Sequence, residues 1–274
     1  MGSISSIETM SCVDGPGIRI VVFLNGCRKR CLYCHNPEMF TMKKDNMDFL
    51  ELVNKIKRYK TYFGKKGGVT FSGGEPLLQT NFLVEVLKKL KKENINVAIE
   101  TSGDYLGNIE ELLKYTDIII LDIKDTREKE YKYLTGQDIS VQEEFIEIIN
   151  NYDLKVHITQ VIIPGINDNL DYLKSLKEYL KKIKNVEEIK FLPYHRLGIE
   201  KYQKLNIPYK LNINDMSIAE CNNLYEKFKK LPWKFLIWRV NYKFVCYIFL
   251  LDIYPVGVYN DNGGKSDGKK KWWY

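Results

Sequence analysis

Six short runs of hydrophobic and β-branched residues recur along the chain, and each predicts a buried strand. These runs are residues 18–24, 68–71, 97–101, 117–123, 156–163 and 186–192. Between them, hydrophobic residues recur at the three- and four-residue steps that predict amphipathic helices. The two clearest stripes are Phe82, Leu83, Val86, Leu87 and Leu90, and Leu170, Leu173, Leu176, Leu180 and Ile183.

The alternation of strands and helices predicts an α/β fold with a parallel sheet. Six strands in this arrangement suit either an open doubly wound sheet or an incomplete β/α barrel. Both architectures place ligands at the carboxyl ends of the strands. Polar residues that directly follow a strand are therefore the first candidates for a functional site.

The pattern changes near Pro232. Residues 234–238 predict a final edge strand, whereas the chain beyond about residue 238 has no clear period. The longest uncharged run there, 244–251, is well short of the roughly 20 apolar residues that span a membrane, so no membrane contact is expected. We expect one domain over residues 1–235 and a tail over residues 236–274 that is dispensable from about Val240.

Composition narrows the class of protein. Of the 274 residues, 45% are hydrophobic and 28% are charged, which excludes disorder, collagen and a disulfide miniprotein. The net charge is +7, but lysines such as Lys88 and Lys92 alternate with acids, so a solvated surface is predicted rather than a nucleic-acid groove. The first eight residues lack the basic start and apolar run of a signal peptide, and a cytoplasmic protein is expected.

Three of the six cysteines lie close together, directly after the predicted strand at residues 18–24. Cys27, Cys31 and Cys34 have the spacing C-x3-C-x2-C. Three thiolates on so short a loop can wrap one corner of an iron–sulfur cube and leave one iron without a protein ligand. The alternative is a zinc-stabilised binding module with His35 as fourth ligand. His35 adjoins Cys34 and would have difficulty turning back to the same metal, which favours the cluster.

Other polar groups also follow predicted strands. The glycines within residues 72–76 allow a close backbone approach, or simply form a turn in which Pro76 opens the next helix. Asp122 and Lys124 share one face of a strand and suit either a ligand site or a surface ion pair. Taken alone, His195 is an ordinary polar loop residue, and residues 14–17 are a Pro-Gly turn.

These motifs together resemble the radical S-adenosylmethionine superfamily. Within it, the chain is most similar to the glycyl-radical-enzyme activating enzymes, in particular those that activate pyruvate formate-lyase. The resemblance implies a partial (β/α)6 barrel. It runs from about residue 11 to residue 231, and the motifs that carry it, in order, are residues 13–19, 26–37, 72–76, 121–124, 164–165 and 192–195.

The resemblance also implies cofactors and chemistry. A 4Fe–4S cluster and S-adenosylmethionine are expected, and a monovalent cation beside them is allowed. Reductive cleavage of S-adenosylmethionine would give a 5′-deoxyadenosyl radical that takes a hydrogen from a glycine of the partner enzyme, with no catalytic side chain beyond the cluster and cofactor. A flavodoxin or ferredoxin would donate the electron, in anaerobic metabolism, to a monomeric activator.

Site residues follow from the same resemblance. The cluster ligands would be Cys27, Cys31 and Cys34. The residues that seat S-adenosylmethionine would be Tyr33, Cys34, His35, Gly73, Gly74, Glu75, Asp122, Ile123, Lys124 and His195. The residues that place the partner's loop would be Asp14, Gly15, Pro16 and Gly17. The other thiols, Cys12, Cys221 and Cys246, match no ligand position and are interpreted as packed or incidental.

Two residues depart from the family pattern, and one alternative function within the family stays open. Thr159 stands where an Arg is usual, and Glu100 stands where an Asp is usual, so cofactor or cation binding can differ here. Residues 37–71 contain no Cys, which favours a pyruvate formate-lyase activator over relatives with a ferredoxin-like insert. An activator of anaerobic ribonucleotide reductase is the runner-up. Short connections at residues 72–80 and 101–108 predict a barrel mouth open to a protein loop.

Overall fold

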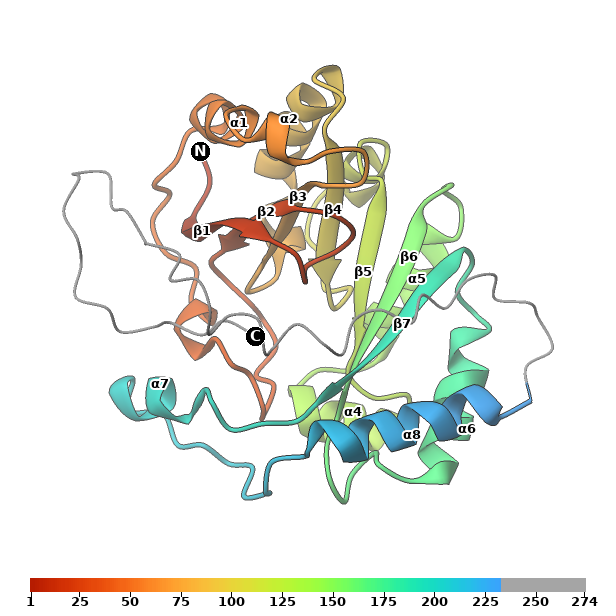
Figure 1. The fold of residues 1–274 in the computed structure, drawn as a ribbon. Helices are drawn as coiled ribbons and strands as arrows, with labels where there is room; N and C mark the ends of the chain where they lie inside the picture. Colours follow the sequence, from red (N-terminus) through yellow and green to blue (C-terminus); the bar gives the residue numbers. More distant parts are fainter. Residues whose placement is uncertain (233–274) are drawn as a thin grey trace.

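A computed structural model describes residues 1–232, in which seven strands form one sheet in chain order (Figure 1). The strands are β1 (Ile4–Ser11), β2 (Arg19–Leu24), β3 (Gly68–Gly73), β4 (Asn96–Thr101), β5 (Ile118–Ile123), β6 (Lys155–Ile162) and β7 (Val186–Pro193). From β2 to β7 all neighbours are parallel. All six predicted strands are confirmed, but β7, which was predicted to be buried, has only Ile189 buried. Their order has no reversal, which agrees with an incomplete β/α barrel and not with a doubly wound sheet.

The first strand is an addition that the hydrophobic pattern did not predict. β1 pairs antiparallel with β2, from Ile4 opposite Leu24 to Ser11 opposite Arg19, with two register shifts. Most of its residues are only half-buried or exposed, so it lacks the continuous hydrophobic run of the parallel strands. Its start is held by Gln79, which accepts from Ser3 N at 2.8 Å and donates to Ser3 O at 3.0 Å.

Helices connect the parallel strands and cover the outside of the sheet (Figure 1). The α-helices are α1 (Phe49–Lys57), α2 (Thr80–Lys92), α3 (Ile109–Leu113), α4 (Glu128–Thr135), α5 (Ser140–Ile149), α6 (Leu170–Leu180), α7 (Ile199–Lys204) and α8 (Ile218–Lys230), and the 3-10 helices are η1 (Pro37–Met39), η2 (Lys60–Tyr62) and η3 (Pro76–Gln79). The stripe predicted over residues 82–90 is buried in α2. The second stripe is correct only in its centre, because Leu170 is exposed at the start of α6 and Ile183 lies beyond its end.

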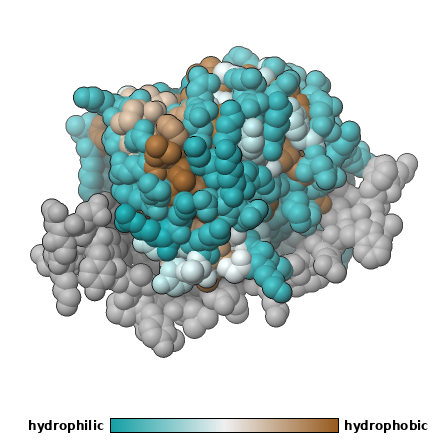
Figure 2. All heavy atoms as spheres, turned by 90° about the horizontal axis from the view of Figure 1, so that it is seen from above, coloured by the Kyte–Doolittle hydropathy of each residue, from teal (hydrophilic) through white to brown (hydrophobic). Residues whose placement is uncertain are grey.

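The charged surface agrees with the predicted solvated face. Seen from above, the molecule is mainly hydrophilic with small hydrophobic patches (Figure 2). Lysines of the outer helices are paired with acids: Lys88 lies 3.3 Å from Glu111, and Lys57 lies 2.6 Å from Glu93. Such pairs contribute little to stability but neutralise the surface locally. The expected absence of a nucleic-acid partner stays a prediction.

The predicted edge strand at residues 234–238 and the tail lie outside the described residues. Their expected dispensability therefore stays a prediction as well. Within residues 1–232, no helix is both long and apolar enough to cross a membrane.

Candidate functional site

The cysteine loop begins at the carboxyl end of β2, where an α/β barrel places its ligands. Two segments distant in sequence fix its backbone. Gly26 N donates to Met39 O at 2.9 Å, and Arg30 N donates to Thr135 O, at the end of α4, at 2.8 Å. A tight turn follows, in which Cys34 N donates to Cys31 O at 3.1 Å. The loop is therefore a built element of the barrel and not a free connection.

The three thiols share a half-buried environment that does not favour negative charge without a cation. None is in a disulfide. Burial raises the pKa of Cys27 and of Cys34 to about 12, and repulsion from the nearby Cys31 adds to both rises. A bound metal reverses this preference, because thiols must lose their proton to become ligands. The donor set therefore fits a cationic metal group.

No three His, Cys, Asp or Glu side chains within residues 1–232 are spaced to hold a single metal ion. A single zinc ion needs all its sulfur ligands about 2.3 Å from one centre. An iron–sulfur cube takes one thiolate on each of several irons, so it requires a wider set of sulfurs. The positions of the three thiols within residues 1–232 therefore do not support a site for a single metal ion.

His35 does not turn toward these thiols. Its Nε2 lies 3.1 Å from His195 O, and its ring stacks on that of His195 with 4.1 Å between centroids. The fourth-ligand role considered for a zinc module therefore finds no support. Burial, together with the neighbouring His35, lowers the pKa of His195 to about 4, so His195 is neutral near pH 7. The two predicted cofactor residues form one aromatic stack beside the cysteine loop.

Two glycines, Gly73 at the end of β3 and Gly74 directly after it, are required by backbone packing. Gly73 has φ of 114°, and a Cβ atom there would lie 2.4 Å from Leu24 N. A Cβ atom at Gly74 would lie 2.3 Å from Gly26 O. Because the two glycines have no Cβ atoms, the turn can lie against the cysteine loop, where Glu75 N donates to Gly26 O at 2.7 Å. The glycines thus shape the loop itself, and their predicted contact with a cofactor stays a prediction.

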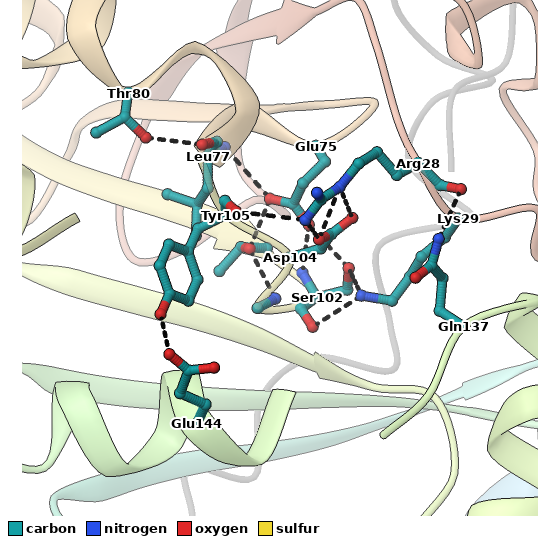
Figure 3. A network of polar contacts seen from close by, with 12 residues as sticks. Arg28, Lys29, Glu75, Leu77, Thr80, Ser102, Asp104, Tyr105, Gln137 and Glu144 are labelled. Carbon is teal, nitrogen blue, oxygen red and sulfur yellow. Dashed lines mark hydrogen bonds and ion pairs between the residues drawn. The ribbon is translucent and has the colours of Figure 1, made fainter. Parts of the chain in front are cut away.

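Glu75 is 1% exposed, and both its carboxylate oxygens bind protein groups (Figure 3). Thr101 Oγ1 donates to Oε1 at 2.6 Å, while Ser102 donates to Oε2 from its hydroxyl at 2.8 Å and from its backbone at 3.0 Å. Oε1 also accepts from Leu77 N at 3.3 Å and caps the short helix that Pro76 opens, as expected. Glu75 therefore joins the turns after β3 and β4.

Asp122 and Lys124 form an ion pair at the end of β5, and Ile123 between them is buried. The ammonium lies 5.6 Å from the ring centroid of Tyr33, inside the cysteine loop. Burial lowers the pKa of Lys124, but the attraction of Asp122 and other neighbours outweighs it, so that pKa lies well above its ordinary value. The pair predicted on one face is thus a partly buried ion pair beside the cysteine loop and not an ordinary surface pair.

The turn at residues 14–17 lies at the opposite end of β2. A Cβ atom at Gly17 would lie 2.4 Å from Gly67 N, just before β3. Arg19, which is fully buried, donates to Pro16 O at 3.1 Å, and Thr70 Oγ1 donates to Asp14 O at 2.6 Å. Burial raises the pKa of Asp14. The predicted contact of this turn with a partner stays a prediction.

The two departures from the family pattern are Glu100, near the end of β4, and Thr159, in β6. Burial, followed by repulsion from Asp14, raises the pKa of Glu100 to about 7, and Ser72 Oγ donates to it at 2.6 Å. Thr159 is in register with Asp122 on β5 and with Lys190 on β7. Thr159 itself carries no charge, but Lys190 lies beside it on the neighbouring strand.

Several buried polar atoms near the loop lack a hydrogen-bond partner among residues 1–232. They are Tyr33 OH, Asp122 Oδ1, Tyr131 OH, His195 Nδ1 and Tyr202 OH. Buried polar groups are normally paired, and unpaired ones mark places where an ion, water or ligand belongs. The set mixes hydroxyls, a carboxylate oxygen and an imidazole nitrogen, which fits a zwitterionic, ribose-containing ligand such as S-adenosylmethionine. The residues present therefore fit both expected cofactors.

The remaining cysteines behave as expected, and two groups near the loop were not foreseen. Cys12 is exposed, and Cys221 is buried in α8, whereas Cys246 lies outside the described residues. Lys29 and Ser102, which are bonded to each other beneath the loop, were missed. The signal that could have found them is a lysine between two cysteine ligands, and a polar residue directly after β4.

Comparison with known proteins gives a consistent result. A sequence model of the Radical SAM superfamily matches residues 21–180. The pyruvate formate-lyase-activating enzyme of Clostridium pasteurianum is 46% identical over 232 residues, covering 84% of this chain and 98% of that enzyme. The enzyme of the same name from Staphylococcus epidermidis is 40% identical over 245 residues, with the same coverage of both chains.

Among solved structures, SuiB of Streptococcus suis bound to its precursor peptide SuiA matches with a TM-score of 0.60. The match covers 76% of this chain and 44% of SuiB at 14% identity. SuiB bound to S-adenosylmethionine matches with a TM-score of 0.59. At this level of identity the likeness concerns the fold, and it agrees with the barrel described above.

Proposed function

Because the chain belongs to the radical S-adenosylmethionine superfamily, and within it to the pyruvate formate-lyase-activating enzymes, we propose that it places a glycyl radical on pyruvate formate-lyase. Its cofactors are a 4Fe–4S cluster and S-adenosylmethionine. The observation that carries the proposal is the loop of Cys27, Cys31 and Cys34, fixed at the carboxyl end of β2 beside unpaired buried polar atoms.

Cys27, Cys31 and Cys34 are proposed to hold three irons of the cluster. When bound and reduced, the cluster and S-adenosylmethionine together supply the 5′-deoxyadenosyl radical that takes hydrogen from a glycine α-carbon. The protein's part is to hold and orient these groups and to keep water out. The backbone bonds from Gly26 to Met39 and from Arg30 to Thr135 serve that purpose, since they prevent the loop from opening.

S-adenosylmethionine is proposed to bind between the ends of β3, β5 and β7. Asp122 has one carboxylate oxygen on Lys124 and one unpaired, and it is suited to receive a cationic or hydroxyl group of the ligand. The neutral His195, stacked on His35, offers an unpaired ring nitrogen for a ribose hydroxyl. Tyr33 and the Gly73–Glu75 turn complete the proposed cradle. The departures at Glu100 and Thr159 are proposed to alter any monovalent-cation site.

The partner and its approach belong to the same proposal. The turn of residues 14–17 is proposed to help place the glycine-bearing loop, with Asp14 facing the charged groups of β4 and β7. A flavodoxin or ferredoxin is proposed as the electron donor, and the activator is proposed to act as a cytoplasmic monomer. Residues 1–235 are proposed to be sufficient for the reaction.

Electron paramagnetic resonance tests this function directly. The full chain is reconstituted with iron and sulfide without oxygen, then incubated with S-adenosylmethionine, a reductant and pyruvate formate-lyase. A glycyl doublet on that enzyme is expected, with the same yield after deletion of residues 240–274. If S-adenosylmethionine is cleaved but no doublet forms, the partner is wrong while the chemistry stands. If no iron is retained, the proposal fails.

A further inference from the structure

Lys29 lies between two of the proposed cluster ligands and is only 2% exposed. Its Nζ donates to Ser102 Oγ at 2.8 Å and to Ser102 O at 3.3 Å (Figure 3). Lysine is almost never fully buried without a specific partner, because removing an ammonium from water is costly. The cysteine loop therefore carries a fixed positive charge on its inner side.

Ser102 connects this lysine to the neighbouring strand ends. Its hydroxyl accepts from Lys29 and donates to Glu75 Oε2 at 2.8 Å. Its carbonyl also accepts from Gln142 Nε2 at 3.0 Å, and the same amide donates to Asp122 O at 3.0 Å. One buried network thus joins the segments after β2, β3, β4 and β5. A change in Lys29 acts on the site as a whole and not on one loop.

The network holds one ammonium and one carboxylate, and both act on the thiols. Lys29 lies in the chain between Cys27 and Cys31, and Glu75 lies against the same loop, where its backbone N donates to Gly26 O at 2.7 Å. Burial raises the pKa of Glu75 above its ordinary value, whereas the attraction of Lys29 and four donors from Thr101, Ser102 and Leu77 favour the carboxylate. The two fixed charges therefore have opposite effects on any electron added at the loop.

The other two cations of the loop are in different surroundings. Arg28 Nε lies 3.1 Å from both oxygens of Asp104, so its charge is balanced by a buried carboxylate. Arg30 is exposed to solvent, which screens its charge. Within residues 1–232, no carboxylate lies within ion-pair distance of Lys29. Lys29 is thus the buried cation of this loop, held over the Tyr131 ring at 5.9 Å and connected to Glu75 through Ser102 without a direct ion pair.

We propose that Lys29 is a positioning residue that fixes the Cys27–Cys31 turn and favours addition of an electron to the group bound by the three cysteines. The inference rests on the proposed function, because that group is the 4Fe–4S cluster. Reduction adds negative charge, and a buried cation stabilises the reduced form more than the oxidised form. Glu75, held in the same network, opposes reduction.

The test is a redox titration of the reconstituted full chain, followed by electron paramagnetic resonance of the reduced cluster. Lys29→Met removes the charge and keeps the length of the side chain. We expect the ratio of reduced to oxidised cluster at a fixed potential to fall at least tenfold. For a one-electron couple this corresponds to a midpoint potential at least about 59 mV more negative. Glu75→Gln, which is isosteric, shifts the midpoint in the opposite direction.

Lys43→Gln is the control, because it removes a charge at an exposed position outside the loop. Its midpoint should stay close to that of the wild type. Equal shifts in Lys29→Met and Lys43→Gln, or shifts of the same sign in Lys29→Met and Glu75→Gln, would overturn the inference. If Lys29→Met does not retain iron, an unmoved midpoint in Glu75→Gln overturns it. A wild-type chain that binds no iron would instead remove the proposed function.

Discussion

The two ends of β2 each bury a cation, but they use it differently. At the amino end, Arg19 is fully buried and donates to Thr70 Oγ1 at 2.7 Å, Val69 O at 2.6 Å and Asn96 Oδ1 at 3.0 Å. At the carboxyl end, Lys29 donates within residues 1–232 to Ser102 alone. The arginine connects β2 to β3 and to the start of β4, and the lysine lies beneath the cysteine loop.

The difference lies in what surrounds each cation. Around Arg19 the acceptors are backbone and side-chain oxygens that the arginine satisfies. Around the cysteine loop, Tyr33, Asp122 and His195 each keep an unpaired buried atom. Polar groups that satisfy one another add stability, whereas groups left unpaired are available to a ligand. In a β/α barrel this division follows the strand direction, with stability at the amino end and chemistry at the carboxyl end.

The largest expected effect comes from the cysteine ligands. Replacing Cys27, Cys31 or Cys34 with Ala should abolish iron retention and S-adenosylmethionine cleavage, because ligation through three cysteines has no spare ligand. Iron content and cleavage, measured without oxygen, report the loss. Cys12→Ala, at an exposed thiol away from the loop, should keep both. A Cys31→Ala protein that still carries a full cluster would refute the assignment.

Arg19→Met tests the amino end. We expect a loss of about 3 kcal/mol or more in the free energy of unfolding, because several charged hydrogen bonds vanish and their acceptors stay buried. Urea unfolding measures this, and Lys89→Met, at an exposed position, should change stability by less than about 0.5 kcal/mol. The fraction that remains folded should still bind iron. If the folded Arg19→Met protein did not bind iron, the contrast between the two ends of β2 would be contradicted.

Asp122→Ala tests the unpaired atoms at the carboxyl end. Affinity for S-adenosylmethionine should fall by about 10- to 150-fold, or about 1.5–3 kcal/mol, since a hydrogen bond to a charged group is lost. Equilibrium binding to the iron-loaded protein measures the change. Asp138→Ala removes the acid of an exposed lysine pair and should have no effect. Equal affinities for the wild type and Asp122→Ala would remove Asp122 from the proposed cradle.

The smallest effect concerns pH. The pKa of His195 is about 4 in the folded chain, below its ordinary value near 6.5. The unfolded chain therefore takes up this proton first, so the contribution of His195 to stability is constant above about pH 6.5 and falls as the pH drops from 6.5 toward 4. Urea midpoints across this range should show a steeper fall for the wild type than for His195→Gln. Parallel slopes would contradict a buried neutral imidazole.

Much of this picture could be predicted from sequence, and the exceptions have physical causes. β2, β3 and β5 are nearly continuous buried runs because both of their faces are covered, whereas β7, at the edge of the sheet, has only Ile189 buried. β1 was missed because it is an edge strand with two register shifts and many half-exposed residues. Leu170 was predicted on the buried face but is exposed, because it is the first residue of α6 and lies at the end of the helix.

For the site, motif spacing identified the cysteines but not their support. Lys29 is the middle one of three cations in a row in the sequence, which does not indicate its burial, and only the fold reveals Ser102 beneath it. Similarly, Gly73 and Gly74 suggested ligand approach, which stays a prediction, and only the fold reveals how closely they lie to Leu24 N and Gly26 O. Contacts between segments far apart in sequence have no local pattern that could announce them.

The bonds from the cysteine loop to the end of α4 have a consequence for synthesis. Arg30 and Leu32 donate to Thr135 and Leu134, and Gln137 reaches the carbonyl of Arg28 across 109 positions. The sheet itself can form progressively, since each strand pairs with the one before it. The loop, however, stays incomplete until α4 leaves the ribosome. We expect a nascent chain that stalls before that point to present three unshielded thiols, which makes it the stage most vulnerable to oxygen.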